Sequence, residues 1–272
     1  MTSILGIDAA WTQTHPSGVA LVSKHATGWQ LTAAEPSYQR FLARTDRSLL
    51  AEKRPSGSPL DASALLASAA KLSGGRIDLV AVDMPLAHTP IVQRRFSDNA
   101  VSRAYGNCKC GTHSPNATRP GKISAELTRA FKREGYPLQT IEFKPPGLIE
   151  VYPHPALVEL AGAKERLPYK ASKVRKYWPK LTPLERRKCL YQQWRDIIKL
   201  LEDEIADVEA ALPRLESDAS GAQLKAYEDT LDAIVCAWVG ICTLEGRAKP
   251  FGDENSAIWI PAPRATTAVA PF

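Results

Sequence analysis

The sequence has no long hydrophobic run and few of the residues that mark specialised protein classes. None of its apolar segments reaches transmembrane length, and its N-terminus lacks the basic start and apolar stretch of a secretory signal. It contains only five cysteines, an odd number without the dense spacing of a disulfide-stapled scaffold. We therefore expect a cytoplasmic protein with reduced thiols and no membrane partner.

The remaining composition is ordinary for a globular protein. Of the 272 residues, 44% are hydrophobic and 24% are charged, which suffices for one large domain. No internal repeat or clear boundary divides the chain. Residues 1–263 are predicted to form a single domain and residues 264–272 a disordered tail.

Positive charge is concentrated in one segment, residues 164–188. It holds ten Lys or Arg and two Glu, an excess of eight that exceeds the net charge of +6 of the whole chain. Basic side chains with interleaved aromatic residues, here including Tyr169, suit contact with nucleic acid, whereas a solvated helix surface is the alternative. The predicted substrate-binding residues of this segment are Lys170, Lys173, Arg175, Lys176, Tyr177 and Trp178.

Hydrophobic periodicity predicts an α/β fold. Residues 3–9, 18–24 and 29–35 read as three short strands of an antiparallel meander, and strands near 79–82 and 148–149 follow, separated by helices. The expected helices are 60–72 with Asp61 as N-cap, 123–136, 184–212 and 223–246, whereas residues 94–122 read as a loop. The basic segment and the long helix after it, about 164–215, are interpreted as a helical insertion.

Three acids, Asp8, Asp83 and Glu150, each close a short apolar strand. Asp229 and Asp232 are three residues apart, so they share one face of the last helix. This face continues through small residues, Ala233, Cys236, Ala237 and Gly240, which would let the helix lie close against the sheet. Acids also end strands because turns favour them, so any single one is weak support for a site.

Together these acids predict a metal site with two Mg²⁺ or Mn²⁺ ions. Oxygen ligands suit these ions, and sites in open α/β sheets form outside the carboxyl ends of strands. The predicted ligands are Asp8, Asp83, Glu150 and Asp232, with Asp229 as the substitute for Asp232. Such a pair of ions supports phosphodiester hydrolysis.

Further candidates surround these acids in the sequence. Arg95 and Arg103 are interpreted as a phosphate clamp or, alternatively, as members of an Arg–Asp structural network. His154 is a candidate catalytic base or a hydrogen-bonded turn residue. Cys108, Cys110 and His113 hint at zinc, although the usual CxxC spacing is absent.

Several blocks of the sequence occur in a family-specific order. In "GIDAAW…SGVAL", "AVDMPL", "RRFSDNAVSRAYG", "EVYPHPAL" and "EDTLDAIVCAWVG" the chain resembles domain-of-unknown-function family 429, from about residue 4 to residue 261. That family is a predicted nuclease family of the RNase H fold. The resemblance implies a mixed sheet with a three-stranded meander followed by parallel strands, and acidic site residues at Asp8, Asp83, Glu150 and Asp229 or Asp232.

The leading hypothesis is a metal-dependent nuclease that acts on DNA or RNA. One alternative is a nucleotide-hydrolysing or phosphotransfer enzyme of the actin-like or sugar kinase type, although the sequence shows neither a second such domain nor a Gly-rich adenosine site. The other alternative is a non-catalytic nucleic-acid-binding protein of the same fold.

Overall fold

A seven-stranded mixed sheet forms the centre of the protein in the computed structural model, which describes residues 2–49 and 54–263. The strand order is β3-β2-β1-β4-β5-β7-β6. β1, β2 and β3 are antiparallel neighbours, β1, β4, β5 and β7 are parallel, and β6 pairs antiparallel with β7. The strands are β1 (Ser3–Asp8), β2 (Gly18–His25), β3 (Gly28–Glu35), β4 (Leu79–Asp83), β5 (Gly147–Val151), β6 (Ala248–Gly252) and β7 (Ala257–Pro261). This arrangement confirms the predicted α/β class and the meander.

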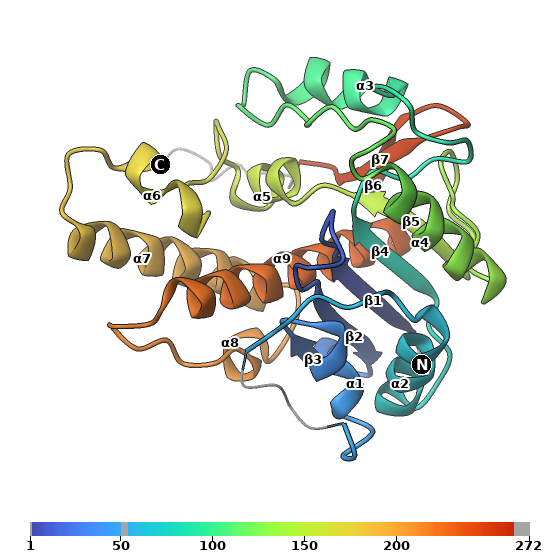
Figure 1. Cartoon of the computed structure of the whole chain (residues 1–272), viewed down its shortest axis with the longest axis horizontal. Coiled ribbons are helices and arrows are strands. Elements are labelled where there is room, and N and C mark those ends of the chain that lie inside the picture. The colour runs from blue at the N-terminus through green and yellow to red at the C-terminus, as the bar shows by residue number, and fades with distance from the viewer. Residues whose placement is uncertain (1, 50–53, 264–272) are drawn as a thin grey trace, which may run out of the picture.

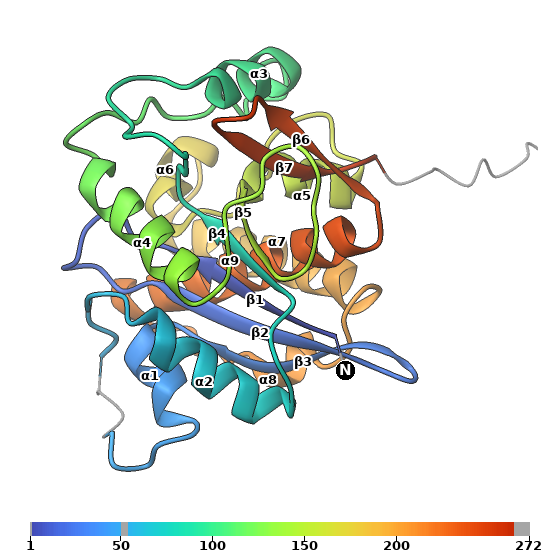
Figure 2. The same cartoon turned by 90° about the vertical axis from the view of Figure 1, so that its right-hand side faces the viewer.

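Helices cover both faces of the sheet (Figures 1 and 2). Strand residues alternate between the two faces, so that Leu5 and Ile7 pack with α1, α2 and α4, while Ile4 packs with α5, α7 and α9. The helices are α1 (Tyr38–Ala43), α2 (Ala62–Ser73), α3 (Phe96–Tyr105), α4 (Gly121–Arg133), α5 (Pro153–Ala161), the 3-10 turn η1 (Ala171–Lys173), α6 (Val174–Tyr177), α7 (Pro183–Glu202), α8 (Val208–Ala211) and α9 (Gly221–Leu244).

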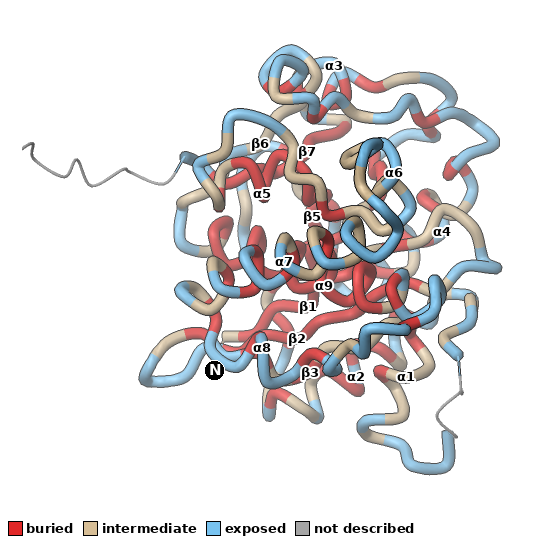
Figure 3. Tube along the Cα trace, turned by 90° about the vertical axis from the view of Figure 1, so that its left-hand side faces the viewer, coloured by how far each residue is buried: buried red, intermediate tan, exposed pale blue. Residues whose placement is uncertain are grey.

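Helix α9 lies unusually close to the strands because glycines face it. A Cβ on Gly6 of β1 would stand 2.3 Å from the carbonyl oxygen of Ala233, and a Cβ on Gly18 of β2 would stand 2.1 Å from that of Asp229. From the helix side, a Cβ on Gly240 would stand 2.6 Å from Ile4. The prediction that small residues allow close packing is therefore confirmed. Figure 3 shows the result as a continuous buried zone through β1, β2 and α9.

The segment after α5 differs from the single long helix that was predicted. All of its predicted apolar positions from Leu190 to Leu212 are buried, but α7 ends at Glu202 and α8 is separate. Between them, Ala206 exchanges backbone hydrogen bonds with Trp29 and Leu31 on the outer strand β3. Because β3 is an edge strand, its free backbone N–H and C=O groups need hydrogen-bond partners. Ala206 supplies them, and the helix is interrupted at this point.

Helices α1, α5 and α6 were not predicted, and three further elements differ from the predictions or lie beyond them. Residues 94–122 are not only loop, since α3 forms within them and Asp98 accepts a hydrogen bond from the backbone N–H of Arg95 at its start. β6 and β7 were not predicted. The predicted disordered tail, 264–272, lies outside the described residues. Across residues 2–49 and 54–263, every helix is too short or too polar to cross a lipid bilayer.

Candidate active site

Two strand-end acids, Asp8 of β1 and Asp83 of β4, form the centre of the candidate site. They are direct neighbours in the parallel register of the two strands. Neither carboxylate has a hydrogen bond or ion pair with another described residue. Both line a cavity of about 300 Å³, together with Trp11, Arg119, Lys225 and Asp229. The structure therefore brings three of the five predicted ligands to one cavity.

The negative charges of these acids repel one another. Burial, followed by the negative charges of Asp232 and Asp229, holds the pKa of Asp8 well above its usual value. Burial and then Asp232 likewise raise the pKa of Asp83 to about 7. A cation between these carboxylates would remove much of this repulsion, because an opposite charge favours the ionised form.

The two acids of α9 differ in their surroundings. Asp232 is fully buried, accepts a 2.7 Å hydrogen bond from the hydroxyl of Tyr169, and pairs with Lys170. Asp229 pairs with Lys225 one turn earlier on the same helix and lines the acidic cavity. Burial raises the pKa of Asp229, and Lys225 opposes that shift. The geometry favours Asp229 over Asp232 as the third oxygen donor, the reverse of the order predicted from the sequence.

The lysines of these pairs keep their charge in the site. Burial disfavours the ammonium of Lys170, but Asp232, Tyr169 and Glu228 together hold its pKa well above the usual value. Burial acts in the same direction on Lys225, whose pKa is nevertheless raised by Asp229 and Asp8. Two fixed positive charges therefore offset part of the acidic cluster.

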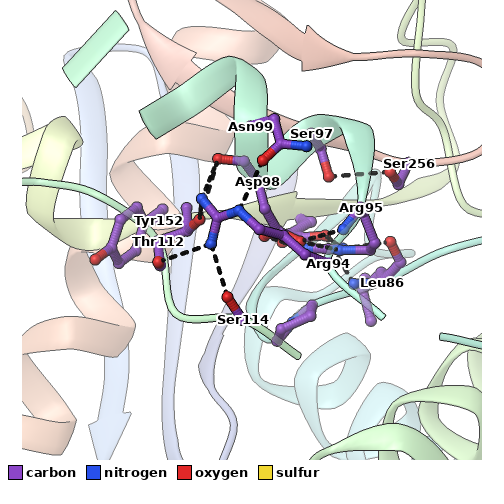
Figure 4. Close-up of polar contacts among 12 residues, drawn as sticks. Leu86, Arg94, Arg95, Ser97, Asp98, Asn99, Thr112, Ser114, Tyr152 and Ser256 are labelled. Atoms are coloured by element: carbon purple, nitrogen blue, oxygen red, sulfur yellow. Dashed lines mark hydrogen bonds and ion pairs between the residues drawn. The ribbon is translucent and has the colours of Figure 1, made fainter. Parts of the chain in front are cut away.

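Glu150 is held by an arginine at the wall of a neighbouring cavity. Its oxygens accept hydrogen bonds of 2.5 and 2.7 Å from the guanidinium of Arg95 and one of 2.7 Å from the backbone N–H of Leu86. Arg95 also binds Asp98 and is itself buried (Figure 4). Burial raises the pKa of Glu150, and Arg95 opposes this. Arg95 thus belongs to an Arg–Asp–Glu network, the structural alternative considered above.

A second, larger cavity of about 480 Å³ adjoins the acidic one. The two cavities share Trp11, Asp83, Arg119 and Lys225. The larger cavity is also lined by Glu150, His113, His154, Arg166, Lys170 and Lys173. We call it the basic cavity, because Arg119, Arg166, Lys170 and Lys173 all border it.

His154 lies in the wall of the basic cavity. Its ring packs edge-to-face between Tyr152 and Tyr169, with centroid distances of 5.4 Å to each. Burial, Lys170 and Arg166 hold its pKa well below the usual value, so the imidazole is neutral at neutral pH. Its Nδ1 atom has no hydrogen-bond partner among the described residues. The burial and positive charges that keep the ring neutral also disfavour its protonation, so they oppose the role of a catalytic base.

The other predicted substrate-binding residues lie at different distances from these cavities. Arg103 is exposed on α3 and lines neither cavity. Arg175 and Lys176 are exposed on α6, while Tyr177 and Trp178 are half-buried and pack edge-to-face. Tyr169 is fully buried, so its ring offers no face for stacking on a base.

Four residues of the site escaped the sequence predictions. Lys225 precedes Asp229 by four residues on α9, a spacing that was readable as an ion pair. Arg119 and Arg166 lie in irregular segments and reach the site only through the fold. Trp11 follows the first acid closely and carries Arg119 over its ring, 5.9 Å from the ring centroid.

The residues considered for zinc do not converge. Cys110 is buried and donates to the backbone carbonyl of Cys108, while His113 packs against Trp11. Burial raises the pKa of the Cys110 thiol to about 11, which opposes formation of a thiolate. Within the described part of the chain, no group of three or more His, Cys, Asp or Glu side chains is arranged to hold a metal ion as it stands.

Comparison with known families supports the family resemblance that the sequence blocks indicated. Residues 6–257 match the family described as "Protein of unknown function (DUF429)". The chain belongs to this family. Comparisons with curated proteins and with solved structures give no significant match. The DUF429 match therefore covers the acidic cavity, all residues of the basic cavity except Ile258, and the acids around both.

Proposed function

We propose that this DUF429 protein is a metal-dependent nuclease with an RNase H-like core. The single observation that carries the proposal is the pair Asp8 and Asp83, two unpartnered carboxylates at the ends of adjacent parallel strands. The strand order β3-β2-β1-β4-β5, antiparallel on one side of β1 and parallel on the other, supports the RNase H-like core. In this proposal β7 and β6 extend that core.

The oxygen donors of the acidic cavity are of the type that Mg²⁺ and Mn²⁺ prefer, and they would have to rearrange to hold an ion. Asp8 and Asp83 would hold the ion. Asp229 would be the third ligand after giving up its ion pair with Lys225. A second ion would need Glu150 or Asp232, which would first have to leave Arg95 or Lys170. When bound, such an ion lowers the pKa of a water and stabilises negative charge on a phosphoryl oxygen.

The surrounding residues suit a nucleic-acid substrate. Arg119, Lys170 and Lys173 supply positive charge beside the acids, so a phosphodiester is attracted to the edge of the acidic cavity. Trp11 presents an aromatic ring at the junction of the two cavities, where an unpaired base can stack. His154, neutral in the basic cavity wall, would form a hydrogen bond to the substrate through its unpaired Nδ1.

The test is hydrolysis of single- and double-stranded DNA and RNA by the purified full chain with Mg²⁺ or Mn²⁺. Wild type should cleave at least one polymer, Asp83→Asn should lose the activity, and Asp218→Asn, an exposed acid outside both cavities, should keep it. Calorimetric titration with Mn²⁺ should show binding that Asp83→Asn weakens. Absence of both cleavage and Mn²⁺ binding would overturn the proposal, and hydrolysis of ATP alone would favour the actin-like alternative.

A further inference from the structure

The basic cavity contains three cations without an acidic partner. Arg119, Arg166 and Lys173 all line it, and none of them forms an ion pair within residues 2–49 and 54–263. By contrast, the neighbouring Lys170 and Lys225 are paired with Asp232 and Asp229. The cavity therefore gathers three cations whose charge no ion pair with a described residue neutralises.

These three cations are close enough to act on the same groups. After burial, the positive charges of Lys173, Arg166 and Arg119 lower the pKa of His113. Burial and then Arg166 and Lys170 lower the pKa of Lys173 itself. Like charges gathered in this way repel one another, and Glu228, which also lines the cavity, offsets only part of this effect on Lys173.

Unsatisfied polar atoms border the same cavity. Nε of Arg166 and Nδ1 of His154 are buried and have no hydrogen-bond partner among the described residues. Buried polar atoms are normally paired, so such atoms indicate a missing ligand or water. The hydroxyl of Ser172 adds a further donor to the wall, since this residue lines the cavity.

We propose that the basic cavity binds the terminal phosphate of a nucleic-acid strand. A phosphate monoester carries about −1.5 to −2 charges at pH 7, which matches three cations better than the single charge of an internal phosphodiester. The volume of about 480 Å³ lies in the range of small-ligand pockets and suits one strand end.

The position of the cavity gives this phosphate a role in the proposed reaction. Because Trp11, Asp83 and Arg119 border both cavities, a strand end held in the basic cavity directs the following phosphodiester toward Asp8 and Asp83. The protein would then cleave near phosphorylated ends. This inference rests on the proposed function for the identity of the polymer, whereas the phosphate site itself follows from the cations.

The experiment measures binding without hydrolysis. Three tetranucleotides of one sequence, with a 5′-phosphate, a 3′-phosphate or hydroxyls at both ends, are titrated calorimetrically into the full chain in EDTA. One phosphorylated form should bind about tenfold more tightly than the hydroxyl form or better, since hydrogen bonds to charged groups are strong. Inorganic phosphate should compete with that form.

Arg166→Gln and Lys173→Gln should each remove most of the preference for the phosphorylated end. Arg166→Lys, which retains the charge, should keep part of it, and thermal unfolding should verify that each variant is folded. The matched control is Lys164→Gln, an exposed lysine of the same segment that does not line the cavity. If Arg166→Gln does not fold, Lys173→Gln decides the question.

Equal affinity for all three tetranucleotides would overturn the inference and favour an internal phosphodiester. An equal loss in Lys164→Gln would also overturn it, because the effect would then be general electrostatics. The outcome is separable from that of the proposed function. A preference for the phosphorylated end without any hydrolysis would support the phosphate site and contradict the nuclease proposal. Hydrolysis without this preference would support the nuclease proposal and contradict the phosphate site.

Discussion

At the scale of single residues, the strand-end acids carry a cost that ordinary folding does not explain. Asp8 and Asp83 are placed side by side by the parallel register of β1 and β4, and no described residue pairs with either carboxylate. Burying a charge without a partner is unfavourable, so the pKa values of both carboxyl groups are raised. Such strained acids are frequent at functional sites.

Replacing Asp8 by Asn should separate stability from activity. Asp8→Asn removes the cost of burying this charge and its repulsion from Asp232 and Asp229, so the metal-free variant should unfold at a temperature about 2–4 °C higher for each kcal/mol gained. The same variant should lose Mn²⁺-dependent hydrolysis. Differential scanning calorimetry in EDTA and a cleavage assay measure the two effects. A lower melting temperature would show instead that Asp8 is a structural partner.

The raised pKa of Asp83 predicts how the stability of the protein depends on pH. Its pKa is about 7 in the folded protein and 3.8 for an ordinary aspartate, so between these values only the folded state keeps the proton. Unfolding then releases a proton, and the free energy of unfolding should fall as pH rises from about 4 to 7, by at most about 1.4 kcal/mol per unit for one group.

Urea unfolding in EDTA at pH 5, 6 and 7 tests this dependence. The Asp83→Asn variant should show a flatter dependence than wild type, because it has no proton to lose. Asp218→Asn serves as the control and should follow wild type. Parallel curves for wild type and Asp83→Asn would contradict the raised pKa.

The two acids of α9 should differ in their importance for metal binding. Asp229 lines the acidic cavity, whereas Asp232 is fully buried and bound by Tyr169 and Lys170. Asp229→Asn should therefore reduce Mn²⁺ affinity more than Asp232→Asn, by about tenfold or more. Calorimetric titration of both variants measures this. The opposite order would restore Asp232 as the ligand, as the sequence had suggested.

At the scale of elements, the site depends on how closely α9 approaches β1 and β2. Gly6 and Gly18 leave room for the helix backbone, and this contact sets the position of Asp229 and Asp232 relative to the strand ends. Because the helix and strands are rigid, a small shift of α9 moves both acids together. Helix packing is in this sense part of the site.

Gly6→Ala should expose this dependence. The new Cβ would lie 2.3 Å from a backbone oxygen of α9, so the helix must move, at a cost of about 1–3 kcal/mol. Mn²⁺ affinity should fall as well. Gly221→Ala is the matched control, since its Cβ meets no atom within 4 Å and alanine favours a helix. Urea unfolding that leaves Gly6→Ala as stable as wild type would contradict the proposed close contact.

At the scale of the whole molecule, positive charge lies on one segment of the chain. Residues 164–188 carry more excess charge than the entire protein, and they pass from the basic cavity to the exposed α6. A strand bound in the cavities would continue along Arg175 and Lys176 of α6. Contacts of that kind bind phosphates without regard to sequence.

Reversing Lys173, Arg175 and Lys176 to Glu should therefore weaken nucleic-acid binding and flatten its salt dependence. Each lost phosphate contact should reduce the slope of log affinity against log salt by about 0.7–0.9. Fluorescence anisotropy over a salt series measures the slope. Reversal of Arg129, Lys132 and Arg133, exposed on α4, is the control with equal charge change. Equal slopes for the two triple variants would contradict a specific role for the segment.

Patterns of neighbouring residues were enough to predict much of the architecture. The apolar runs of β1 and β2, the Asp61 cap of α2 and the small-residue face of α9 all act over short distances in sequence, and the structure confirms each of them. Local sequence patterns did not predict elements that depend on pairing between distant segments. The edge of β3 interrupts the helix after Glu202, and β6 pairs with β7 at the far edge of the sheet.

The sequence by itself determined which acids end strands and that Asp229 and Asp232 share a helix face, because both depend only on local periodicity. Only the tertiary structure decided which of these acids has a cation beside it. Arg95 reaches Glu150 across 55 residues and Lys170 reaches Asp232 across 62, contacts that no spacing rule encodes. The same long-range packing left Asp8 and Asp83 without partners and gathered Arg119, Arg166 and Lys173 around one cavity.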